Sequence, residues 1–318
     1  MTNRDISIVT GGAGFIGSSL VDRLLAIGNK VVVIDDFSTG RLSNLEESRT
    51  DDEERLQVIS LDVRDSGVTE IIADLKPGTI FHLAAQVDLR HSVSDPLFDA
   101  ETNILGTLRV LEGARKSNAN KVVVAASGGT LYGAQDSGLL PFKESLSPNP
   151  GTPYGISKAV TMNYLSAYDD LYGLDGTALA LANVYGPRQD PHGEAGVVAI
   201  FAGQLLRGEK SIIFGTGEQT RDFVYVDDAV DAFIKASEIK KTKFCNVGTG
   251  TETSVNDLYQ VMSSLIGSSS QPEYLPSRKG ELERSALDPT YAKETLDWHS
   301  STSLEEGLLR TIEWFKKN

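Results

Sequence analysis

Short apolar runs alternate with amphipathic stretches along the first half of the chain. The run Lys30–Asp35 is mostly β-branched, which is typical of a parallel strand covered on both faces. Repeated alternation of strand and helix predicts a parallel sheet with helices on both sides, because parallel strands need crossover connections. We expect strands at Ile6–Thr10, Lys30–Asp35, Leu56–Ser60, Thr79–His82 and Lys121–Ala125, and helices at Phe15–Ile27, Ser66–Leu75, Asp95–Lys116 and Thr152–Leu171.

The second half is less regular and contains glycine- and proline-rich loops around Gly186–Gly196 and Gly215–Gln219. We expect these loops to project over the carboxyl edge of the sheet and to form a smaller α/β substrate-binding lobe. The expected division is a first domain of residues 1–178, to which some later strands return, and a second domain of residues 179–318. Further strands are expected at Thr177–Leu181, Phe223–Val226 and Lys243–Val247, and a final helix at Leu304–Phe315.

Composition narrows the range of partners. The chain has 318 residues, of which 40% are hydrophobic and 23% charged, and its formal net charge is −14. An acidic surface repels nucleic acid and anionic membranes, so neither is expected as a partner. No apolar run approaches the ~20 residues that span a bilayer. The single cysteine, Cys245, allows no disulfide within the chain, which fits a cytoplasmic protein, and the four histidines match no metal-binding spacing.

A glycine-rich turn follows the first expected strand and precedes a helix. Gly11, Gly14 and Gly17 satisfy G-x-x-G-x-x-G, and Gly12, Gly14 and Gly17 satisfy G-x-G-x-x-G. Such glycines let the backbone approach a pyrophosphate, which then lies at the helix N-terminus. An ordinary glycine-rich turn is the alternative, but the order strand, turn, helix favours a dinucleotide site and hence a doubly wound Rossmann sheet.

Acidic residues after the next two strands extend this site. Asp35 ends the second strand, 18 residues after Gly17, and can accept hydrogen bonds from an adenosine ribose diol. Asp36 follows it, and two carboxylates would repel a 2′-phosphate, so NAD is expected rather than NADP. A merely solvated Asp36 is the alternative. Asp62 follows the third strand, where it could contact the adenine or only cap a turn.

Tyr154 and Lys158 are candidates for acid–base chemistry. Thr152 is a good N-cap and Pro153 suits the first helical position, so a helix is expected to begin here. Residues four apart share a helix face, and both an adjacent ammonium and a helix N-terminus favour the phenolate of Tyr154. Two residues on a solvated helix face are the alternative. Ser127 follows the fifth strand, where its hydroxyl could bind a substrate oxygen or only form a turn.

Together these motifs resemble one family over essentially the whole chain. The chain resembles the UDP-glucose (UDP-galactose) 4-epimerases of the extended short-chain dehydrogenases/reductases. The resemblance implies an isomerase with tightly bound NAD, in which the sugar passes through a transient 4-keto form. The segments that carry the resemblance are Thr10–Gly17, Val33–Gly40, His82–Gln86, Ser127–Gly133, Tyr154–Lys158, Asn183–Gln189, Gln219–Asp228 and Arg278–Asp288.

The resemblance implies roles for individual residues. Tyr154 would be the catalytic base, Lys158 would lower its pKa and hold the nicotinamide ribose, and Ser127 would position the sugar hydroxyl. The expected cofactor-binding residues are Gly11, Gly14, Phe15, Ile16, Gly17, Asp35, Asp36, Asp62, Val63, Leu83, Ala84, Ala85, Asn103, Tyr154 and Lys158. The expected substrate-binding residues are Ser127, Tyr154, Asn183, Val198, Arg221, Arg278 and Ser285.

Arg221 and Arg278 also suit a diphosphate by their own chemistry. Forked guanidinium groups match phosphate oxygens, and an acidic chain has few cations to spare. A surface salt bridge is the alternative for either residue. Two positions depart from the family pattern: Ala180 stands where many relatives carry an arginine, and Val87 stands where some epimerases carry a cofactor-binding lysine.

Related reactions remain as alternatives. Nucleotide-sugar 4,6-dehydratases and decarboxylases commonly carry an acidic residue after the position of Ser127, where this chain has Gly128 and Gly129. A UDP-glucuronate 4-epimerase stays open, with Arg90 as a candidate for the carboxylate. A non-catalytic NAD-binding sensor is the alternative from another class, but such proteins usually lack the tyrosine. Ser285 replaces a bulky tyrosine of some epimerases, so UDP-GlcNAc and UDP-GalNAc are also expected as substrates.

The resemblance further implies a homodimer. Relatives pair through the helices that match Asp95–Lys116 and Thr152–Leu171, which gives a four-helix interface. Leu105 and Leu165 are apolar residues outside the expected core stripe of these helices. We therefore expect a dimer in solution, with a role in galactose metabolism.

Overall fold

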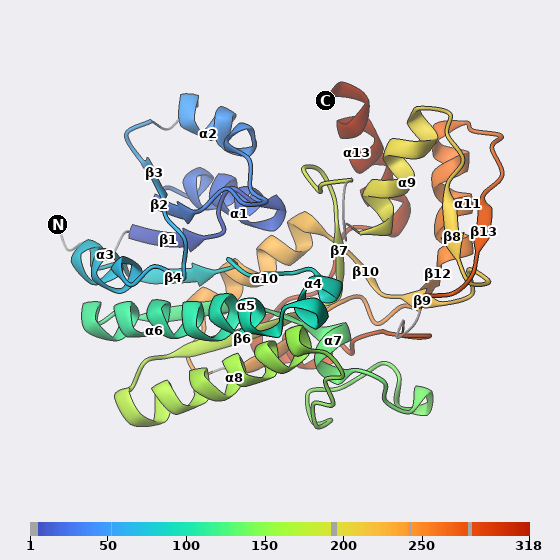
Figure 1. The fold of residues 1–318 in the computed structure, drawn as a ribbon. Helices are drawn as coiled ribbons and strands as arrows, with labels where there is room; N and C mark the ends of the chain where they lie inside the picture. Colours follow the sequence, from blue (N-terminus) through green and yellow to red (C-terminus); the bar gives the residue numbers. More distant parts are fainter. Residues whose placement is uncertain (1–5, 52, 192–195, 242, 279–281) are drawn as a thin grey trace.

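A seven-stranded parallel sheet forms the centre of the molecule (Figure 1). The structure is a computed structural model that describes residues 6–51, 53–191, 196–241, 243–278 and 282–318. The strands of this sheet are β1 (Ile6–Thr10), β2 (Lys30–Asp35), β3 (Leu56–Ser60), β4 (Thr79–His82), β5 (Lys121–Ser127), β6 (Gly176–Leu181) and β11 (Phe244–Val247). Their order is β11-β6-β5-β4-β1-β2-β3, so the chain winds outward from the centre in both directions. The expected doubly wound sheet is confirmed, with its switch point between β1 and β4.

The hydrophobic pattern predicted the strands closely. The bounds of β1, β2, β3 and β4 are those expected. β5 continues two residues beyond the expected end and thereby includes Ser127. β6 begins one residue before the expected Thr177, and β11 begins one residue after the expected Lys243.

Ten helices flank this sheet in the described part of the chain. They are α1 (Phe15–Ala26), α2 (Glu46–Asp51), α3 (Gly67–Leu75), α4 (Leu89–Ser94), α5 (Pro96–Ala100), α6 (Gly106–Ser117), α7 (Gly128–Tyr132), α8 (Pro153–Tyr172), α10 (Val226–Glu238) and α12 (Thr290–Leu296). Within the described ranges, no helix combines the length and the apolar character needed to cross a bilayer.

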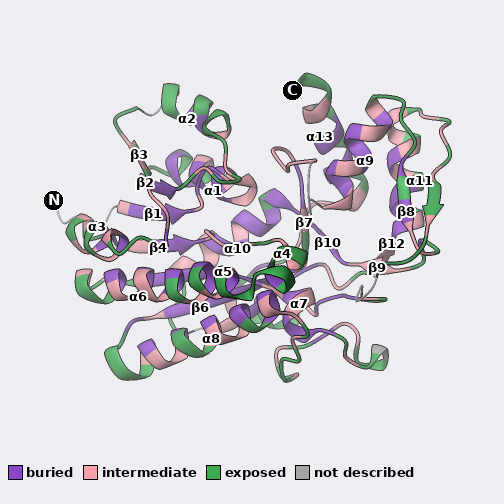
Figure 2. Ribbon diagram, viewed as in Figure 1, coloured by how far each residue is buried: buried purple, intermediate pink, exposed green. Residues whose placement is uncertain are grey.

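Helices on the two faces of the sheet enclose two hydrophobic clusters (Figure 2). Along β2, Val31 and Val33 belong to the cluster with α1 and α10, whereas Val32 and Ile34 belong to the cluster with α3, α6 and α8. Successive side chains of a strand point to opposite faces, so both faces of β2 are buried. This confirms the expectation drawn from its β-branched sequence.

The helix expected over Asp95–Lys116 is interrupted. α5 and α6 are joined by a π-helical turn, η3, at Glu101–Leu105. Asn103 lies in this turn and is buried. π-helical turns are rare and often mark functional positions. The hydrophobic periodicity of the sequence did not reveal this turn, because a π-helical turn shifts the spacing of apolar residues by only one residue relative to an α-helix.

A second lobe is built from short strands and three helices. Its elements are β7 (Asn183–Tyr185), β8 (Ile212–Phe214), β9 (Thr220–Arg221), β10 (Phe223–Tyr225), β12 (Thr253–Ser254), β13 (Glu273–Leu275), α9 (Val197–Leu206), α11 (Val255–Ile266) and α13 (Leu304–Lys317). The strands pair as β7 with β10, β8 with β13 and β9 with β12. Figure 1 shows this lobe to the right of the sheet, beyond its carboxyl edge.

The strand expected at Phe223–Val226 ends one residue early. β10 pairs with β7 outside the main sheet, and Val226 begins α10 instead. Asp227 and Asp228 lie in the first turn of this helix, where carboxylates stabilise the positive end of the helix dipole. The apolar run concealed this helix start, so α10 was not predicted.

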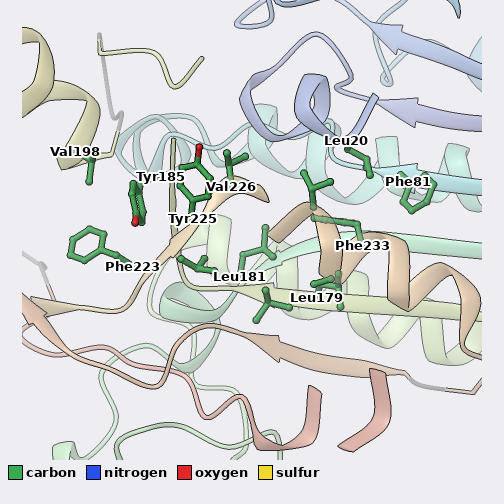
Figure 3. Packing of buried hydrophobic residues seen from close by; sticks show 14 of the residues in the cluster. Leu20, Phe81, Leu179, Leu181, Tyr185, Val198, Phe223, Tyr225, Val226 and Phe233 are labelled. Atoms are coloured by element: carbon green, nitrogen blue, oxygen red, sulfur yellow. The ribbon is translucent and has the colours of Figure 1, made fainter. Parts of the chain in front are cut away.

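One core cluster extends from the sheet into the second lobe. Figure 3 shows Leu20 and Phe81 near the sheet, and Tyr185, Val198 and Phe223 further toward the second lobe, in the same cluster. The expected division after residue 178 lies within β6, which pairs with both β5 and β11. The division into two domains stays a prediction.

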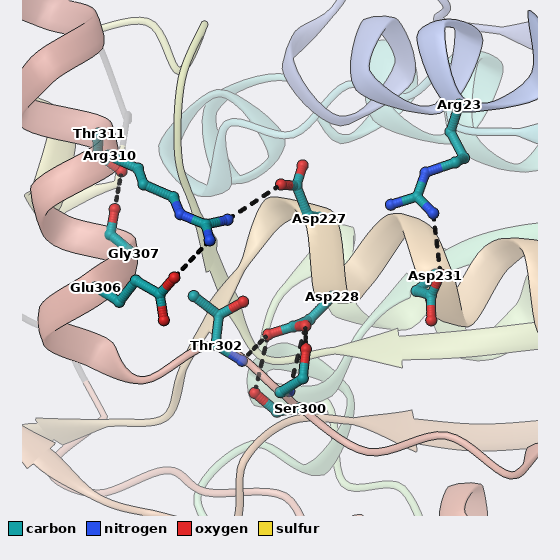
Figure 4. A network of polar contacts seen from close by, with 11 residues as sticks. Arg23, Asp227, Asp228, Asp231, Ser300, Thr302, Glu306, Gly307, Arg310 and Thr311 are labelled. Carbon is teal, nitrogen blue, oxygen red and sulfur yellow. Dashed lines mark hydrogen bonds and ion pairs between the residues drawn. The ribbon is translucent and has the colours of Figure 1, made fainter. Parts of the chain in front are cut away.

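A polar network attaches the C-terminal segment to α10 (Figure 4). The buried carboxylate of Asp228 accepts hydrogen bonds from Ser300, Ser301 and Thr302. Arg310 of α13 forms ion pairs with Asp227 on α10 and with Glu306 on its own helix. These contacts hold α13 of the second lobe against α10.

Candidate active site

Four strands of the sheet end at one edge, and they bring candidate residues together there. Thr10, Asp35, His82 and Ser127 are the last residues of β1, β2, β4 and β5. Ligands of doubly wound sheets bind in the crevice beyond the carboxyl ends of the strands, at the switch point. The expected cofactor and catalytic residues therefore lie at the place where this fold binds ligands.

The glycine-rich turn is shaped by close backbone contacts. Gly11 has φ +70°, and a Cβ atom there would lie 2.7 Å from the backbone nitrogen of Ala84. A Cβ atom at Gly17 would lie 2.1 Å from the backbone oxygen of Gly11, so α1 packs directly on the turn. Gly14 is the N-cap of α1 and provides no side-chain acceptor for the first amides of the helix. The amides of the first turn therefore suit the pyrophosphate of NAD.

Asp35 is built into this turn. It is buried, and it accepts hydrogen bonds from the amides of Ala13 and Phe37, each at 2.8 Å. Burial raises the pKa of its carboxyl group, against the lowering effect of the two backbone hydrogen bonds. A carboxylate that organises the turn while keeping free lone pairs fits a ribose diol. Asp36 is exposed and accepts hydrogen bonds from Ser38.

Asp62 caps its own turn. Its carboxylate accepts a hydrogen bond of 2.7 Å from the amide of Arg64 and two more from the Arg64 guanidinium. The hydrogen bond with this guanidinium holds the pKa of Asp62 below its usual range. The structure thus contains the turn cap that was the alternative for Asp62. The contact of Asp62 with adenine and the binding of the cofactor by Val63 stay predictions.

α8 begins as expected and carries the tyrosine–lysine pair. Thr152 is the N-cap and accepts a hydrogen bond from the amide of Gly155, and Pro153 is the first residue of the helix. Tyr154 and Lys158 are 9% and 6% exposed, so the alternative of a solvated helix face is excluded. The Lys158 ammonium donates a hydrogen bond of 3.1 Å to the backbone oxygen of Ala125.

Ser127 completes the expected set. Its hydroxyl lies near Tyr154 and lowers the pKa of that phenol, but burial dominates and raises the pKa of Tyr154 to about 12. Burial likewise lowers the pKa of Lys158 to about 8. Burial thus has the largest effect on Tyr154, and the lowering of its pKa by Lys158 stays a prediction. The three side chains are brought together, and their catalytic roles stay predictions.

The serine register is explained by packing. Gly128 is buried, and a Cβ atom at this position would come within 2.4 Å of the Leu287 side chain. No hydroxyl fits there without a shift, whereas Ser127 at the end of β5 reaches Tyr154. The choice of Ser127 over position 128 is therefore supported.

The loop after β4 is held by Asn103. The Asn103 side chain accepts a hydrogen bond from the amide of Gln86 at 3.0 Å and donates one to the backbone oxygen of Gln86 at 2.9 Å. It thereby fixes the loop that contains Leu83, Ala84 and Ala85. The amide of Leu83 donates a hydrogen bond to the backbone of Thr10, which ties the loop to the glycine-rich turn. Cofactor contacts by this loop stay a prediction.

The expected substrate residues lie on the second lobe or face it. Asn183 begins β7 and is exposed, while Arg221 in β9 is half-buried. The Arg278 guanidinium lies 3.8 Å from the centre of the Phe214 ring, which holds its planar fork in place. Ser285 is 4% exposed, and its hydroxyl would lie 3.5 Å from a Cβ atom on Gly129. Ser285 thus lies beside the turn that carries Ser127.

Val198 does not offer its side chain to a ligand. It is 1% exposed in the hydrophobic core, near Tyr185 and Phe223 (Figure 3). Only its backbone, in the first turn of α9, is placed for binding. That turn has no side-chain cap. A substrate contact by Val198 stays a prediction, and the backbone amide of Val198 would make it.

Sequence reasoning missed a buried polar network behind Tyr154 and Lys158. His82 bonds Thr10 at 2.7 Å and Thr107 at 2.9 Å through its two ring nitrogens. Burial lowers the pKa of His82 to about 3, so the ring is neutral. Asp99 is completely buried and accepts a hydrogen bond of 2.6 Å from Ser157. The sequence did contain one signal of this network, because Asp99 is an acidic residue on the inward side of an expected helix.

A surface pocket of about 440 Å³ is lined by none of these candidates, although its lining residue Thr253 pairs with Arg221. It is lined by hydroxyl side chains of the segments around Thr249 and Ser301, together with His299. It contains neither Tyr154 nor Lys158. The chemistry at the sheet edge, not the volume of this pocket, locates the candidate site.

The chain is similar to proteins of known name over nearly its full length. The family model described as GDP-mannose 4,6 dehydratase matches residues 8–311. A UDP-glucose 4-epimerase of Mycolicibacterium smegmatis is 47% identical over 98% of both chains. A UDP-glucose 4-epimerase of Thermotoga maritima, solved with UDP-glucose, has a TM-score of 0.93 and 44% identity over 98% of this chain and 99% of that chain. A UDP-glucose 4-epimerase of Thermus thermophilus, solved with NAD, has a TM-score of 0.89 and 38% identity, again over 98% of this chain and 99% of that chain.

The resemblance drawn from the motifs is thus confirmed across the whole chain. These matches show that the chain belongs to the GDP-mannose 4,6 dehydratase family of extended short-chain dehydrogenases/reductases.

Proposed function

We propose that this chain is an NAD-dependent 4-epimerase that interconverts UDP-glucose and UDP-galactose through a transient 4-keto sugar. The observation that carries the proposal is the buried set of Ser127, Tyr154 and Lys158 at the sheet edge, in a chain 47% identical to a UDP-glucose 4-epimerase. Residues that meet at this edge from α8 and β5 suit the removal and return of one hydroxyl proton.

Epimerisation at C4 requires oxidation, because that carbon carries no acidic proton. NAD bound at the glycine-rich turn supplies a hydride acceptor and donor for C4, and its positive charge favours the Tyr154 phenolate. Tyr154 takes the proton of the sugar 4-OH and later returns it to the keto oxygen. Lys158 stabilises the phenolate with its ammonium, and Ser127, which lies near Tyr154, orients the sugar hydroxyl.

Holding the nucleotide while the sugar turns is the task of the second lobe. Arg278 is preorganised by its stacking on Phe214, and Arg221 lies in the neighbouring short sheet. We assign the UDP diphosphate to these two guanidinium groups and to the uncapped first turn of α9. The 4-keto sugar can then turn either face of its C4 atom toward the hydride donor while the diphosphate stays bound.

The surroundings of Ser127 favour epimerisation over elimination. Dehydratases and decarboxylases of this family need an acidic group after the serine position, and this chain has Gly128 and Gly129. A side chain at position 128 would collide with Leu287. A UDP-sugar oxidised at C4 therefore meets no carboxylic acid from this turn.

We also propose that the pocket admits a substituent at C2 of the sugar. Ser285 is the small residue beside Gly129, where a tyrosine would occupy the space. UDP-GlcNAc and UDP-GalNAc are therefore proposed as further substrates.

A homodimer is proposed from an exposed apolar surface. On α5, η3 and α8, Leu97 is 77% exposed, Leu105 45% and Ile156 49%. Leu165, expected on this surface, is instead buried in the core, so that part of the expectation is wrong. Light scattering after size exclusion should give twice the chain mass of 34.3 kDa. A cytoplasmic location and a role in galactose metabolism are proposed with the same function.

The proposal is tested by incubating the purified protein with UDP-galactose and separating the nucleotide sugars by chromatography. UDP-glucose should appear without added cofactor if NAD is tightly bound. Conversion of UDP-glucuronate alone would assign the site to the uronate epimerases. Failure with every UDP-sugar, with and without added NAD, would contradict the proposed function.

A further inference from the structure

Asp99 is a fully buried carboxylate with three hydrogen-bond donors. It lies on α5 and is 0% exposed. One carboxylate oxygen accepts from the Ser157 hydroxyl at 2.6 Å, and the other accepts from the amide groups of Asn103 at 2.9 Å and Gln86 at 3.4 Å. A buried charge is costly unless it is paired and hydrogen-bonded, so a carboxylate at this place calls for a compensating cation.

The compensating cation is one residue beyond Ser157. Lys158 is 6% exposed, and its ammonium donates its hydrogen bond to a neutral backbone oxygen, that of Ala125. The negative charge of Asp99 acts on this ammonium and raises the pKa of Lys158 against the effect of burial. Asp99 thus supplies the negative charge that balances the positive charge of Lys158. Ser157 lies between the two groups.

The remaining titratable group in this region is neutral. His82 lies between Thr10 and Thr107, and burial and the charge of Lys158 hold its pKa at about 3. Thr107 uses its hydroxyl proton toward the backbone oxygen of Asn103 at 2.7 Å, so the Nε2 of His82 carries the proton that Thr107 accepts. Asp99 is therefore the negative charge that faces Tyr154 and Lys158 from α5, while β4 contributes a neutral ring.

We propose that Asp99 is a positioning residue for the proposed epimerase: its buried carboxylate supplies the negative charge opposite Lys158 and, through Ser157, holds the face of α8 that carries Tyr154 and Lys158. The inference rests on the proposed function for its effect on turnover. Its electrostatic part, the coupling between Asp99 and Lys158, holds whatever sugar is bound.

The sign of the coupling follows from the charges. Removal of the negative charge of Asp99 destabilises the Lys158 ammonium and lowers its pKa below about 8. The same removal also lowers the pKa of Tyr154, because Asp99 disfavours the phenolate. Both limbs of the pH profile of kcat should therefore move to lower pH by about one unit, a usual effect of one nearby charge.

Asp99→Asn is the variant that removes the charge and keeps the shape. Its amide oxygen can still accept from Asn103, and its amide nitrogen can donate to Ser157. Ser157→Ala is the matched control, because it removes one hydrogen bond and leaves the carboxylate. Asp99→Ser, which leaves room for a water molecule, replaces Asp99→Asn if thermal melting shows that the latter does not fold.

The first readout is the pH profile of kcat with UDP-galactose for the enzyme as purified. Asp99→Asn should move both limbs to lower pH, and Ser157→Ala should leave them at the wild-type positions. A profile that is lowered uniformly at every pH, with both limbs unmoved, would show a structural role only and would overturn the proposal.

The second readout needs no catalysis. The difference in unfolding free energy between wild type and Lys158→Met should rise above about pH 8, where buried Lys158 loses its proton while the unfolded chain keeps it. The same difference measured in the Asp99→Asn background should begin to rise about one pH unit lower. An unchanged onset would overturn the coupling even if epimerase activity is present. A lowered onset in an inactive protein would support the coupling and reject only the proposed function.

Discussion

The ammonium of Lys158 lies 5.7 Å from the centre of the Tyr154 ring, on the same face of α8. Its hydrogen bond to Ala125 fixes it against β5, beside the residue pair Ala126 and Ser127. Both side chains are buried, so water screens little of the attraction between the ammonium and a phenolate at Tyr154.

Tyr154→Phe should remove turnover without harming the fold. The loss of the proton-transfer group should lower kcat by about 10²–10⁴-fold, because no other described hydroxyl at this site has Lys158 beside it. Only the polar contact of the phenol with Ser127 is lost, so the free energy of unfolding should change by about 1 kcal/mol or less. Kinetics and urea unfolding on the same sample check both expectations. Near-normal kcat in the variant would remove Tyr154 from its assigned role.

The contribution of Lys158 to the unfolding free energy should rise as the pH increases from 8. The pKa of Lys158 in the folded chain is about 8, below the ordinary lysine value of 10.5, so the folded state loses this proton first. Between these values the unfolded state binds more protons, and the unfolding free energy therefore rises with pH. The rise, taken as wild type minus Lys158→Met, should reach at most about 3 kcal/mol. Tyr154 has its pKa raised to about 12 and opposes the trend only above pH 10. A flat difference would show that Lys158 is not desolvated.

Gly17→Ala should disturb the dinucleotide turn. The new Cβ would overlap the backbone oxygen of Gly11 at 2.1 Å, so α1 or the turn must shift. We expect a loss of about 1–3 kcal/mol in the unfolding free energy, together with weaker NAD binding. Gly151→Ala is the control, because a Cβ there meets nothing within 4 Å. Equal stability of the two variants would contradict the close packing of α1 on the turn.

Ser285→Tyr should change the choice of sugar. The larger side chain fills the space beside Gly129, so activity with UDP-GlcNAc should fall about tenfold or more relative to UDP-glucose. Ser285→Ala should leave the ratio of the two activities near the wild-type value. Competition between the two substrates in one reaction measures this ratio directly. If the ratio is unchanged in Ser285→Tyr, the space beside Ser285 does not select the sugar.

Local patterns predicted those parts of the fold that local physics decides. The β-branched run Lys30–Asp35 could only be a strand buried on both faces, and Thr152-Pro153 could only begin a helix, so both boundaries were correct. The positions of Asp35 and Ser127 at strand ends followed from the same runs. The set Ser127, Tyr154 and Lys158 could thus be predicted before any contact was known.

Features that depend on distant partners were not predicted. Asp99 is buried, and one of its hydrogen-bond donors, Ser157, lies 58 residues later in the sequence. The high pKa of Tyr154 arises from burial beneath several elements, which the neighbouring Lys158 in the sequence does not reveal. α10 escaped prediction because its first residue, Val226, continues an apolar strand.

The most direct test of the central claim follows the hydrogen at C4. UDP-galactose that carries deuterium at C4 is incubated with the protein as purified in ordinary water, and the UDP-glucose formed is analysed by mass spectrometry and NMR. The account predicts that the deuterium stays at C4 of UDP-glucose, because the hydride removed in the oxidation is returned to the same carbon. UDP-glucose that has lost its deuterium to water would contradict the transient 4-keto route.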